Sequence, residues 1–283
     1  MDNFEMKSFL IFSDLDGSFL HHQNYSFGKN DLIIEKLKKN NHQIIFNSSK
    51  TFFEIRIILK KLKLTMMPFS CENGATLYFP KTIFKKIKKS LSFEDYWKIN
   101  LTNKNSLKWY KILKELKKDF HFEIICDLSK KDILKLTNLK DIKQMLKREA
   151  SQLIIWKDNK KNFNEFSKMI KINCKGSLNQ GGRFIQISSP CNKRIATKEI
   201  CHIYHESFGD KFYQSIIAIG DNKNDRDMLN LAKYSCVIKN KYSAPIKLNY
   251  LKKNVFYSQT DAPLGWEESL KHLNKKLNGK IYQ

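Results

Sequence analysis

The sequence predicts an α/β protein in which a parallel sheet is interrupted by an α+β insertion. Short apolar runs near both ends of the chain alternate with amphipathic helices and end in polar loops, which is typical of buried parallel strands. In the middle of the chain, strands and helices do not alternate strictly. With 283 residues, of which 41% are hydrophobic and 28% charged, the chain is long enough for two folded domains.

The amino-terminal part predicts a strand–helix–strand unit. Residues 9–13 form an apolar run that ends at Asp14, and residues 43–46 form a second one. Between them, residues 31–39 carry apolar side chains at helical spacing, so we expect two parallel strands joined by a helix. Residues 53–64 repeat the helical pattern.

The remaining elements follow the same two patterns. From about residue 81 to 179 the sequence is rich in lysine and predicts helices at 107–118, 136–148 and 161–170 and strands at 122–126 and 152–156. A strand at 183–187 is expected to return to the core, and we place the boundaries of the insertion near Pro80 and Gly181. The last part predicts a strand at 215–219, a helix at 226–232, a strand at 236–238 and a solvated end at 275–283.

The charge balance bears on partners. The chain has 52 Lys and Arg against 28 Asp and Glu, a net charge of +24, which raises nucleic acid or an anionic membrane as candidates. Only five of the basic residues are arginines, whereas phosphate and base recognition favours the planar fork of Arg. We therefore expect no specific nucleic-acid partner, although this charge would attract a phosphorylated anion.

Membrane insertion and export are also not indicated. No window approaches the length of a membrane span, and the first ten residues carry charges where a signal peptide needs an apolar run. We expect a cytoplasmic protein.

Acidic side chains follow the predicted strands, at the edge where open α/β sheets build their sites. Asp14 and Asp16 are separated by one residue and are followed by Gly17. One carboxylate can attack phosphorus, while the other protonates the leaving oxygen and later activates water. Asp221 and Asp225 lie in a turn after a later strand and offer hard oxygen ligands that suit Mg²⁺. A metal there would offset the charge of a phosphate ester that approaches an aspartate.

A hydroxyl and a lysine complete the pattern. Ser48, followed by Ser49 and Lys50, comes after the second strand, where a hydroxyl and backbone amides can hold phosphate oxygens. Lys193 precedes a helical run and can neutralise charge on the transferred group. Each motif alone is more often an ordinary loop, but the four in this order predict a phosphoryl-transfer site.

This arrangement resembles the haloacid dehalogenase superfamily of Mg²⁺-dependent phosphatases, which have a doubly wound parallel-sheet core and work through an aspartyl-phosphate. The resemblance implies that Asp14 is the nucleophile and Asp16 the general acid and base. It also implies that Ser48 binds the phosphoryl group and that Lys193 stabilises the nucleophile. Lys198 is the alternative to Lys193, because Arg194 stands where the family often has Gly.

The same resemblance implies a metal site and a cap. The implied Mg²⁺ ligands are Asp14, the carbonyl of Asp16 and Asp221, with support from Asn224 and Asp225. The stretch between Asp16 and Ser48 is too short for a domain, so the cap follows the second motif. We expect a core of residues 1–80 and 183–283 and an α+β cap of residues 81–182.

Five further stretches resemble one branch of this superfamily, the mannosyl-3-phosphoglycerate phosphatases. They are Ser48-Ser49-Lys50-Thr51, Cys71-Glu72-Asn73-Gly74-Ala75, Arg148-Glu149-Ala150-Ser151, Gly181-Gly182-Arg183-Phe184 and Ala262-Pro263-Leu264-Gly265-Trp266. This resemblance implies a small phosphorylated glycoside as partner. Mannosyl-3-phosphoglycerate, or its glucosyl relative, would be hydrolysed to phosphate and the glycosylglycerate, a compatible solute.

Such a substrate carries a carboxylate and a phosphate, so its site needs cations beyond the metal. Arg148 and Arg183 lie in the stretches just named, and a retained Arg favours bidentate carboxylate binding. The alternative for each is a surface ion pair with a neighbour such as Glu149. The other candidate substrate residues, which either line the pocket or shape it, are Ser49, Lys50, Asn73 and Ser151.

Two rival interpretations stay open. One is a broad sugar-phosphate phosphatase on the same scaffold, which would differ only in the specificity of its cap. The other is a basic nucleic-acid-binding protein with a vestigial phosphatase core. The sequence alone also leaves open the identity of the sugar and the oligomeric state.

Overall fold

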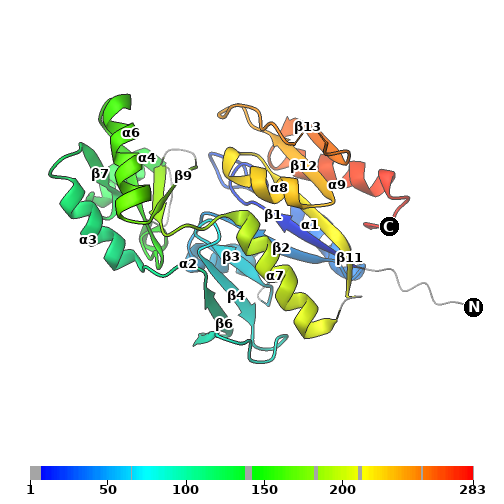
Figure 1. The fold of residues 1–283 in the computed structure, drawn as a ribbon. Helices are drawn as coiled ribbons and strands as arrows, with labels where there is room; N and C mark the ends of the chain where they lie inside the picture. Colours follow the sequence, from blue (N-terminus) through cyan, green and yellow to red (C-terminus); the bar gives the residue numbers. More distant parts are fainter. Residues whose placement is uncertain are drawn as a thin grey trace, which may run out of the picture.

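The computed structural model describes residues 8–64, 66–137, 142–181, 184–209, 212–249 and 251–282. Within these ranges the chain forms a nine-stranded sheet and a separate four-stranded sheet (Figure 1). Across the same ranges, no helix has the length and apolar character needed to span a membrane.

The large sheet has the strand order β13-β12-β11-β1-β2-β3-β4-β6-β5. Neighbours from β13 to β3 are parallel, and those from β3 to β5 are antiparallel. The strands predicted at both ends of the chain are therefore confirmed. The bounds are β1 (Ser8–Ser13), β2 (Gln43–Asn47), β3 (Phe69–Cys71), β4 (Thr76–Pro80), β5 (Leu91–Phe93), β6 (Tyr96–Asn100), β11 (Tyr213–Gly220), β12 (Tyr234–Lys239) and β13 (Val255–Asp261).

Helices cover both faces of this sheet, so the core is doubly wound as expected (Figure 1). Alternation along β1 shows why: Phe9 and Ile11 belong to one buried cluster, and Leu10 and Phe12 belong to the other. The first cluster includes residues of α1 (Asn30–Lys39), α2 (Phe52–Lys61) and α9 (Leu264–Lys276). The second includes residues of α7 (Lys193–Phe208) and α8 (Arg226–Leu231).

A small module with its own core lies at one end of the molecule (Figure 1). Its antiparallel sheet has the order β7-β8-β10-β9, and the side chains of Trp109, Ile154 and Phe166 pack beneath it. The strands are β7 (Phe122–Ile124), β8 (Ser151–Trp156), β9 (Ser177–Gly181) and β10 (Phe184–Ser188). The helices are α3 (Ser106–Leu116), α4 (Lys130–Thr137), α5 (Ile142–Met145) and α6 (Lys160–Lys168), with short turns at Ile125–Asp127 and Met169–Asn173.

The boundaries of this module differ from those that the sequence predicts. A boundary near Pro80 is wrong, because β5 and β6 continue the large sheet by pairing antiparallel with β4. The strand predicted at 183–187 also does not return to the core, since β10 pairs with β8 and β9 in the small sheet. The module therefore begins after Asn100 and ends after Ser188.

Two other expectations differ from the structure. The helix predicted at 136–148 does not reach Arg148: α4 covers Lys130–Thr137, residues 138–141 lie outside the described residues, and α5 covers Ile142–Met145. Arg148 lies beyond α5, where its guanidinium reaches toward the large sheet. The predicted solvated end is ordered to Tyr282, because the backbone amides of Ile281 and Tyr282 donate to Asn274 and both side chains are buried in the core cluster.

Candidate active site

The predicted phosphoryl-transfer residues converge at one edge of the large sheet. Strands β1, β2 and β11 are parallel neighbours, so their carboxyl ends lie together. Asp14 follows β1, Ser48 follows β2 and Asp221 follows β11. These loops, together with the small module, enclose a cavity of about 150 Å³.

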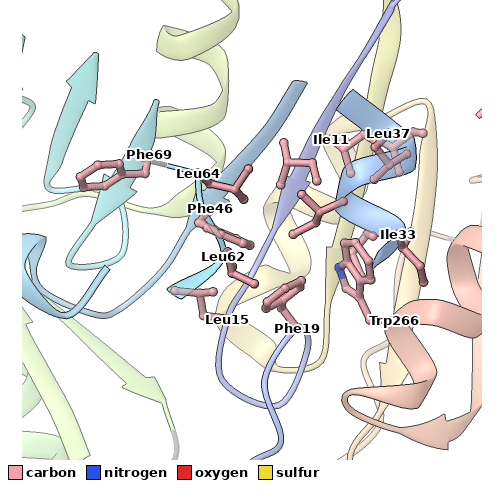
Figure 2. Close-up of a cluster of buried hydrophobic side chains, with 14 of the residues drawn as sticks. Ile11, Leu15, Phe19, Ile33, Leu37, Phe46, Leu62, Leu64, Phe69 and Trp266 are labelled. Carbon is pink, nitrogen blue, oxygen red and sulfur yellow. The ribbon is translucent and has the colours of Figure 1, made fainter. Parts of the chain in front are cut away.

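The loop that carries Asp14 and Asp16 is anchored from beneath. The amide of Asp14 donates to the carbonyl oxygen of Ile219 at 2.9 Å, which continues the β1–β11 pairing. Leu15 and Phe19 point the other way, into the apolar cluster around Trp266 (Figure 2). Because apolar side chains alternate with the two carboxylates, burial of Leu15 and Phe19 turns the carboxylates toward the cavity.

Gly17 allows this loop to approach Asp221. Its φ is +83°, and a Cβ there would lie 2.5 Å from Oδ2 of Asp221. The next residue, Ser18, donates its hydroxyl to Oδ1 of Asp221 at 2.8 Å. Asn240 donates to Oδ2 of the same carboxylate at 2.5 Å, so the Asp221 side chain is held on two sides.

Lys193 lies between two carboxylates. Its ammonium is 2.5 Å from Asp14 Oδ1 and 2.6 Å from Asp225 Oδ1, and its side chain is fully buried. Burial lowers the pKa of Lys193, but the two carboxylates outweigh burial and raise the pKa above its ordinary value. Lys198, the alternative lysine, is exposed on α7 and has no place in this cluster.

Three buried carboxylates form a cluster that could hold a metal ion. Oxygens of Asp14, Asp221 and Asp225 lie within 4.8 Å of one another. Burial and mutual repulsion raise the pKa of Asp14 to about 7 and that of Asp221 well above its ordinary value. Three carboxylates against the single ammonium of Lys193 leave excess negative charge, so a divalent cation with a preference for oxygen fits this donor set.

Asp225 is the most tightly held member of the cluster. Its Oδ2 accepts the backbone amides of Asp221 and Asn222, and its Oδ1 accepts from Lys193. Through these contacts Asp225 orients both the loop and Lys193. Its supporting role at the metal, which the family resemblance implies, stays a prediction.

The side chain of Asp16 is turned toward Lys50 rather than toward the three carboxylates. Lys50 Nζ is 2.9 Å from Asp16 Oδ2, 3.7 Å from Glu54 and 4.9 Å from the centre of the Tyr25 ring. Burial lowers the pKa of Lys50, but Asp16 and Glu54 raise it above its ordinary value, so Lys50 stays charged. The other expected metal-supporting residue, Asn224, donates to Asn73 Oδ1 at 3.0 Å.

The cavity wall contains Ser49, Lys50, Asn73 and Arg148, four of the six candidate substrate residues. Ser151 lies behind Arg148, and Arg183 lies outside the described residues, so its role stays a prediction. Ser48 is fully buried, and its hydroxyl accepts from the amide of Lys50 at 3.2 Å. The small module contributes Met145, Arg148, Leu153, Asn179, Phe184 and Gln186 to the wall.

Arg148 is held inside the molecule and is not a surface residue. Its Nε donates to Ser151 Oγ at 2.8 Å, and its Nη2 donates to the carbonyl oxygen of Ser49 at 3.1 Å. Glu72 lies 3.6 Å away and carries the opposite charge. The alternative pairing of Arg148 with Glu149 is wrong, because Glu149 pairs with Lys98.

Two buried residues of the site are not among the site residues that the sequence predicts, although Glu72 lies in one of the stretches that carry the family resemblance. Glu72 accepts the amides of Glu149 and Ala150, and thereby ties the large sheet to the small module. Gln186, on β10, bonds to residues of both parts. The Asn73-Gly74 pair does predict a turn, and the structure shows positive φ at Glu72, Asn73 and Gly74.

The fold and these loops define a class of enzyme that has an α/β core and carries its reactive carboxylates at the carboxyl ends of parallel strands. The chain belongs to the haloacid dehalogenase-like hydrolase family, whose model matches residues 11–249. It is therefore an enzyme of the hydrolase class, and the family resemblance seen in its motifs is confirmed.

Two curated relatives share a narrower name. A glucosyl-3-phosphoglycerate/mannosyl-3-phosphoglycerate phosphatase from Methanococcoides burtonii is 26% identical over 278 residues, which cover 95% of this chain and 98% of the relative. A protein of the same name from Persephonella marina is 27% identical over 268 residues, covering 92% of this chain and 95% of the relative.

Solved structures show the same fold at low identity. Protein 0175 of Thermoplasma acidophilum has a TM-score of 0.66 and 15% identity, covering 96% of this chain and 99% of the other. A haloalkanoate-superfamily phosphatase, BT1666, from Bacteroides thetaiotaomicron has a TM-score of 0.64 and 14% identity, covering 97% and 98%. Both matches extend over the core and the small module.

Proposed function

We propose that this protein is a Mg²⁺-dependent phosphatase of the cytoplasm. Its substrate would be mannosyl-3-phosphoglycerate or glucosyl-3-phosphoglycerate, and its products the glycosylglycerate and phosphate. One observation carries the phosphatase activity: the Asp14 carboxylate faces a cavity, beside a buried lysine and within a carboxylate cluster that could hold a cation. The names of the two curated relatives support the substrate.

The carboxylates divide the reaction into two steps. In the first, an oxygen of Asp14 bonds to phosphorus, the bond from phosphorus to the glycerate oxygen breaks, and Asp16 gives that oxygen a proton. In the second, Asp16 takes a proton from water, whose oxygen bonds to phosphorus and releases the Asp14 carboxylate. Asp16 lines the cavity and has 29% of its side chain exposed, so it can reach both the leaving oxygen and water.

Charge must be balanced while a phosphate approaches these carboxylates. Asp14 and Asp221, with the carbonyl of Asp16, would hold Mg²⁺, which supplies positive charge to the phosphoryl oxygens when bound. Lys193 contacts Asp14 directly and opposes the rise that burial causes in the pKa of Asp14, which favours the ionised, attacking carboxylate. Chelation by EDTA should therefore abolish hydrolysis and added Mg²⁺ should restore it, whereas an EDTA-resistant activity would contradict the metal site.

The cations of the cavity wall fit a substrate that carries a carboxylate as well as a phosphate. Lys50 and Arg148 line the same cavity as Asp14, and Arg148 comes from the small module. In its observed position Arg148 is oriented by Ser49, Ser151 and Gln186, which accept from its Nε and Nη2 and leave the two N–H donors of Nη1 for a substrate carboxylate. The glycerate carboxylate is the group that these cations would recognise.

The test is Mg²⁺-dependent phosphate release from a panel of esters: mannosyl-3-phosphoglycerate, glucosyl-3-phosphoglycerate, 3-phosphoglycerate and common hexose phosphates. We expect kcat/KM for the glycosylated phosphoglycerates to exceed the others by about a hundredfold or more, or roughly 3 kcal/mol. Comparable rates across the panel would instead make the protein a broad sugar-phosphate phosphatase. No hydrolysis, together with salt-resistant nucleic-acid binding by the Asp14→Asn variant, would favour the nucleic-acid alternative.

A further inference from the structure

A chain of side-chain amides crosses from the loop after β11 to the small module. Asn224 Nδ2 donates to Asn73 Oδ1 at 3.0 Å, and Asn73 Nδ2 donates to Gln186 Oε1 at 2.9 Å. Gln186 Nε2 donates to the backbone oxygen of Glu72 at 2.7 Å. Arg148 Nη2 also donates to Gln186 Oε1, at 3.1 Å. A single oxygen atom of Gln186 therefore contacts both Arg148 and the core loop.

The direction of every bond in this chain is determined at Gln186. The backbone oxygen of Glu72 can only accept a hydrogen bond, and the guanidinium of Arg148 can only donate one. Gln186 must therefore turn its NH₂ group to Glu72 and its oxygen to Arg148, so Asn73 must donate to that oxygen. Asn73 then presents its own oxygen to the NH₂ group of Asn224.

The far end of this chain of amides is the side-chain oxygen of Asn224, which lies in the same loop as Asp221 and Asp225. The NH₂ group of Asn224 is engaged by Asn73, which leaves the carbonyl oxygen as the other end of the Asn224 amide. This oxygen is buried and has no hydrogen-bond partner among the described residues. Oxygen is the ligand atom that Mg²⁺ prefers, directly or through water, and Asn224 immediately precedes Asp225 of the carboxylate cluster.

We propose that Gln186 is a positioning residue that orients both the Asn224 amide, in the loop after β11, and the guanidinium of Arg148. Its oxygen fixes the orientation of the Asn73 and Asn224 amides, so that the buried Asn224 oxygen is the unpaired end of the chain of amides among the described residues, and the same oxygen holds Arg148 at the cavity wall. Gln186 is itself buried on β10, so its orientation is rigid. Because one atom serves both contacts, metal affinity and recognition of the substrate carboxylate depend on the same small-module residue. This inference rests on the proposed function, in that Arg148 binds substrate and the cluster binds Mg²⁺.

The test compares three variants by calorimetric titration with Mg²⁺ alone, without substrate. Gln186→Met removes the shared oxygen, and we expect its Mg²⁺ Kd to rise about tenfold, since buried partners lose their hydrogen bonds. Gln186→Glu keeps an acceptor for Asn73 and Arg148 but loses the donor to the Glu72 carbonyl, so its Kd should lie between those of wild type and Gln186→Met. The matched control is Gln152→Met on the neighbouring strand β8, because Gln152 is also buried but donates to Ser106 inside the small module.

Kinetics supply the second readout. With added Mg²⁺ at saturation, Gln186→Met should raise KM for mannosyl-3-phosphoglycerate about tenfold and change KM for p-nitrophenyl phosphate much less, because the latter has no carboxylate. Equal losses of melting temperature in Gln186→Met and Gln152→Met with an unchanged Mg²⁺ Kd would make Gln186 purely structural and overturn the proposal.

The titration separates this inference from the proposed function. If the wild type hydrolyses no phosphoglycerate ester but Gln186→Met still weakens Mg²⁺ binding selectively, the inference stands and the proposed function fails. If the wild type hydrolyses these esters but its Mg²⁺ Kd is the same in all three variants, the proposed function stands and the inference fails. A wild type that binds no Mg²⁺ overturns the inference.

Discussion

Replacing Lys193 with methionine should destabilise the protein by several kcal/mol, more strongly at alkaline than at acidic pH. Methionine has nearly the length of lysine but no charge, so the variant keeps most of the packing and removes one cation. The Lys193 ammonium contacts Asp14 at 2.5 Å and Asp225 at 2.6 Å, and none of its side chain is exposed.

The magnitude follows from burial. Removal of one partner from a buried ion pair costs about 3–5 kcal/mol, because the remaining charge has no compensating partner. Protonation limits the loss: the pKa of Asp14 is already raised to about 7, mainly by burial, and without Lys193 it rises further. The variant can therefore keep a proton on Asp14 where the wild type has lost it.

The sign of the pH dependence follows from the same shift. A carboxyl with a raised pKa contributes stability below its unfolded pKa, and this stability is lost as the pH rises through its folded pKa. Asp14 of the variant titrates at higher pH than Asp14 of the wild type. The stability difference between the two proteins should therefore widen as the pH rises from about 6 to about 8.

Urea unfolding in EDTA, followed by circular dichroism at both pH values, measures this difference. Lys198→Met is the matched control, since Lys198 is exposed on the same helix and its removal should change stability by less than about 0.5 kcal/mol. Equal losses in the Lys193→Met and Lys198→Met variants, or a difference that narrows with rising pH, would refute the electrostatic role of Lys193.

Three further perturbations have expected outcomes. Gly17→Ala places a Cβ 2.5 Å from Asp221 Oδ2 at a φ of +83°, so it should lower the free energy of unfolding by about 1–3 kcal/mol and weaken Mg²⁺ binding in calorimetry. An unchanged Mg²⁺ Kd would contradict this expectation. Burial lowers the pKa of His42, whose Nδ1 accepts from the backbone amide of Phe9, so the contribution of His42 to native stability should be full above about pH 6.5 and fall on acidification. A His42→Gln variant should lose this pH dependence in urea unfolding, and an unaltered pH profile would contradict the role of His42. Arg148→Lys should raise KM for phosphoglycerate esters about tenfold and leave p-nitrophenyl phosphate nearly unaffected; equal changes would make Arg148 structural.

The parts of the fold that the sequence predicts are those with a local pattern. Strands β1, β2, β11 and β12 are apolar runs that end at polar loops, and parallel strands buried on both faces need such runs. The same rule located Asp14 and Asp221, because each directly follows one of these strands. Lys193 is predicted from its position before a helical run. In the structure Asn192 caps α7, and the next side chain, that of Lys193, enters the carboxylate cluster.

The parts that the sequence does not predict depend on distant partners. The side chains of Glu72 and Gln186 are each satisfied by groups far away in the chain, so the local sequence around either residue does not reveal these contacts. The terminal residues look solvated because lysines surround them, yet Ile281 is fully buried against the core.

The most direct test of the central claim is the rate of Mg²⁺-dependent phosphate release from mannosyl-3-phosphoglycerate by wild type and by Asp14→Asn. The amide keeps the shape of the carboxylate but is a far weaker nucleophile, so we expect kcat to fall by about a thousandfold or more, equivalent to roughly 4 kcal/mol. Circular dichroism should show the same fold in both proteins. Activity of the Asp14→Asn variant within tenfold of wild type would contradict a phosphatase that works through this aspartate.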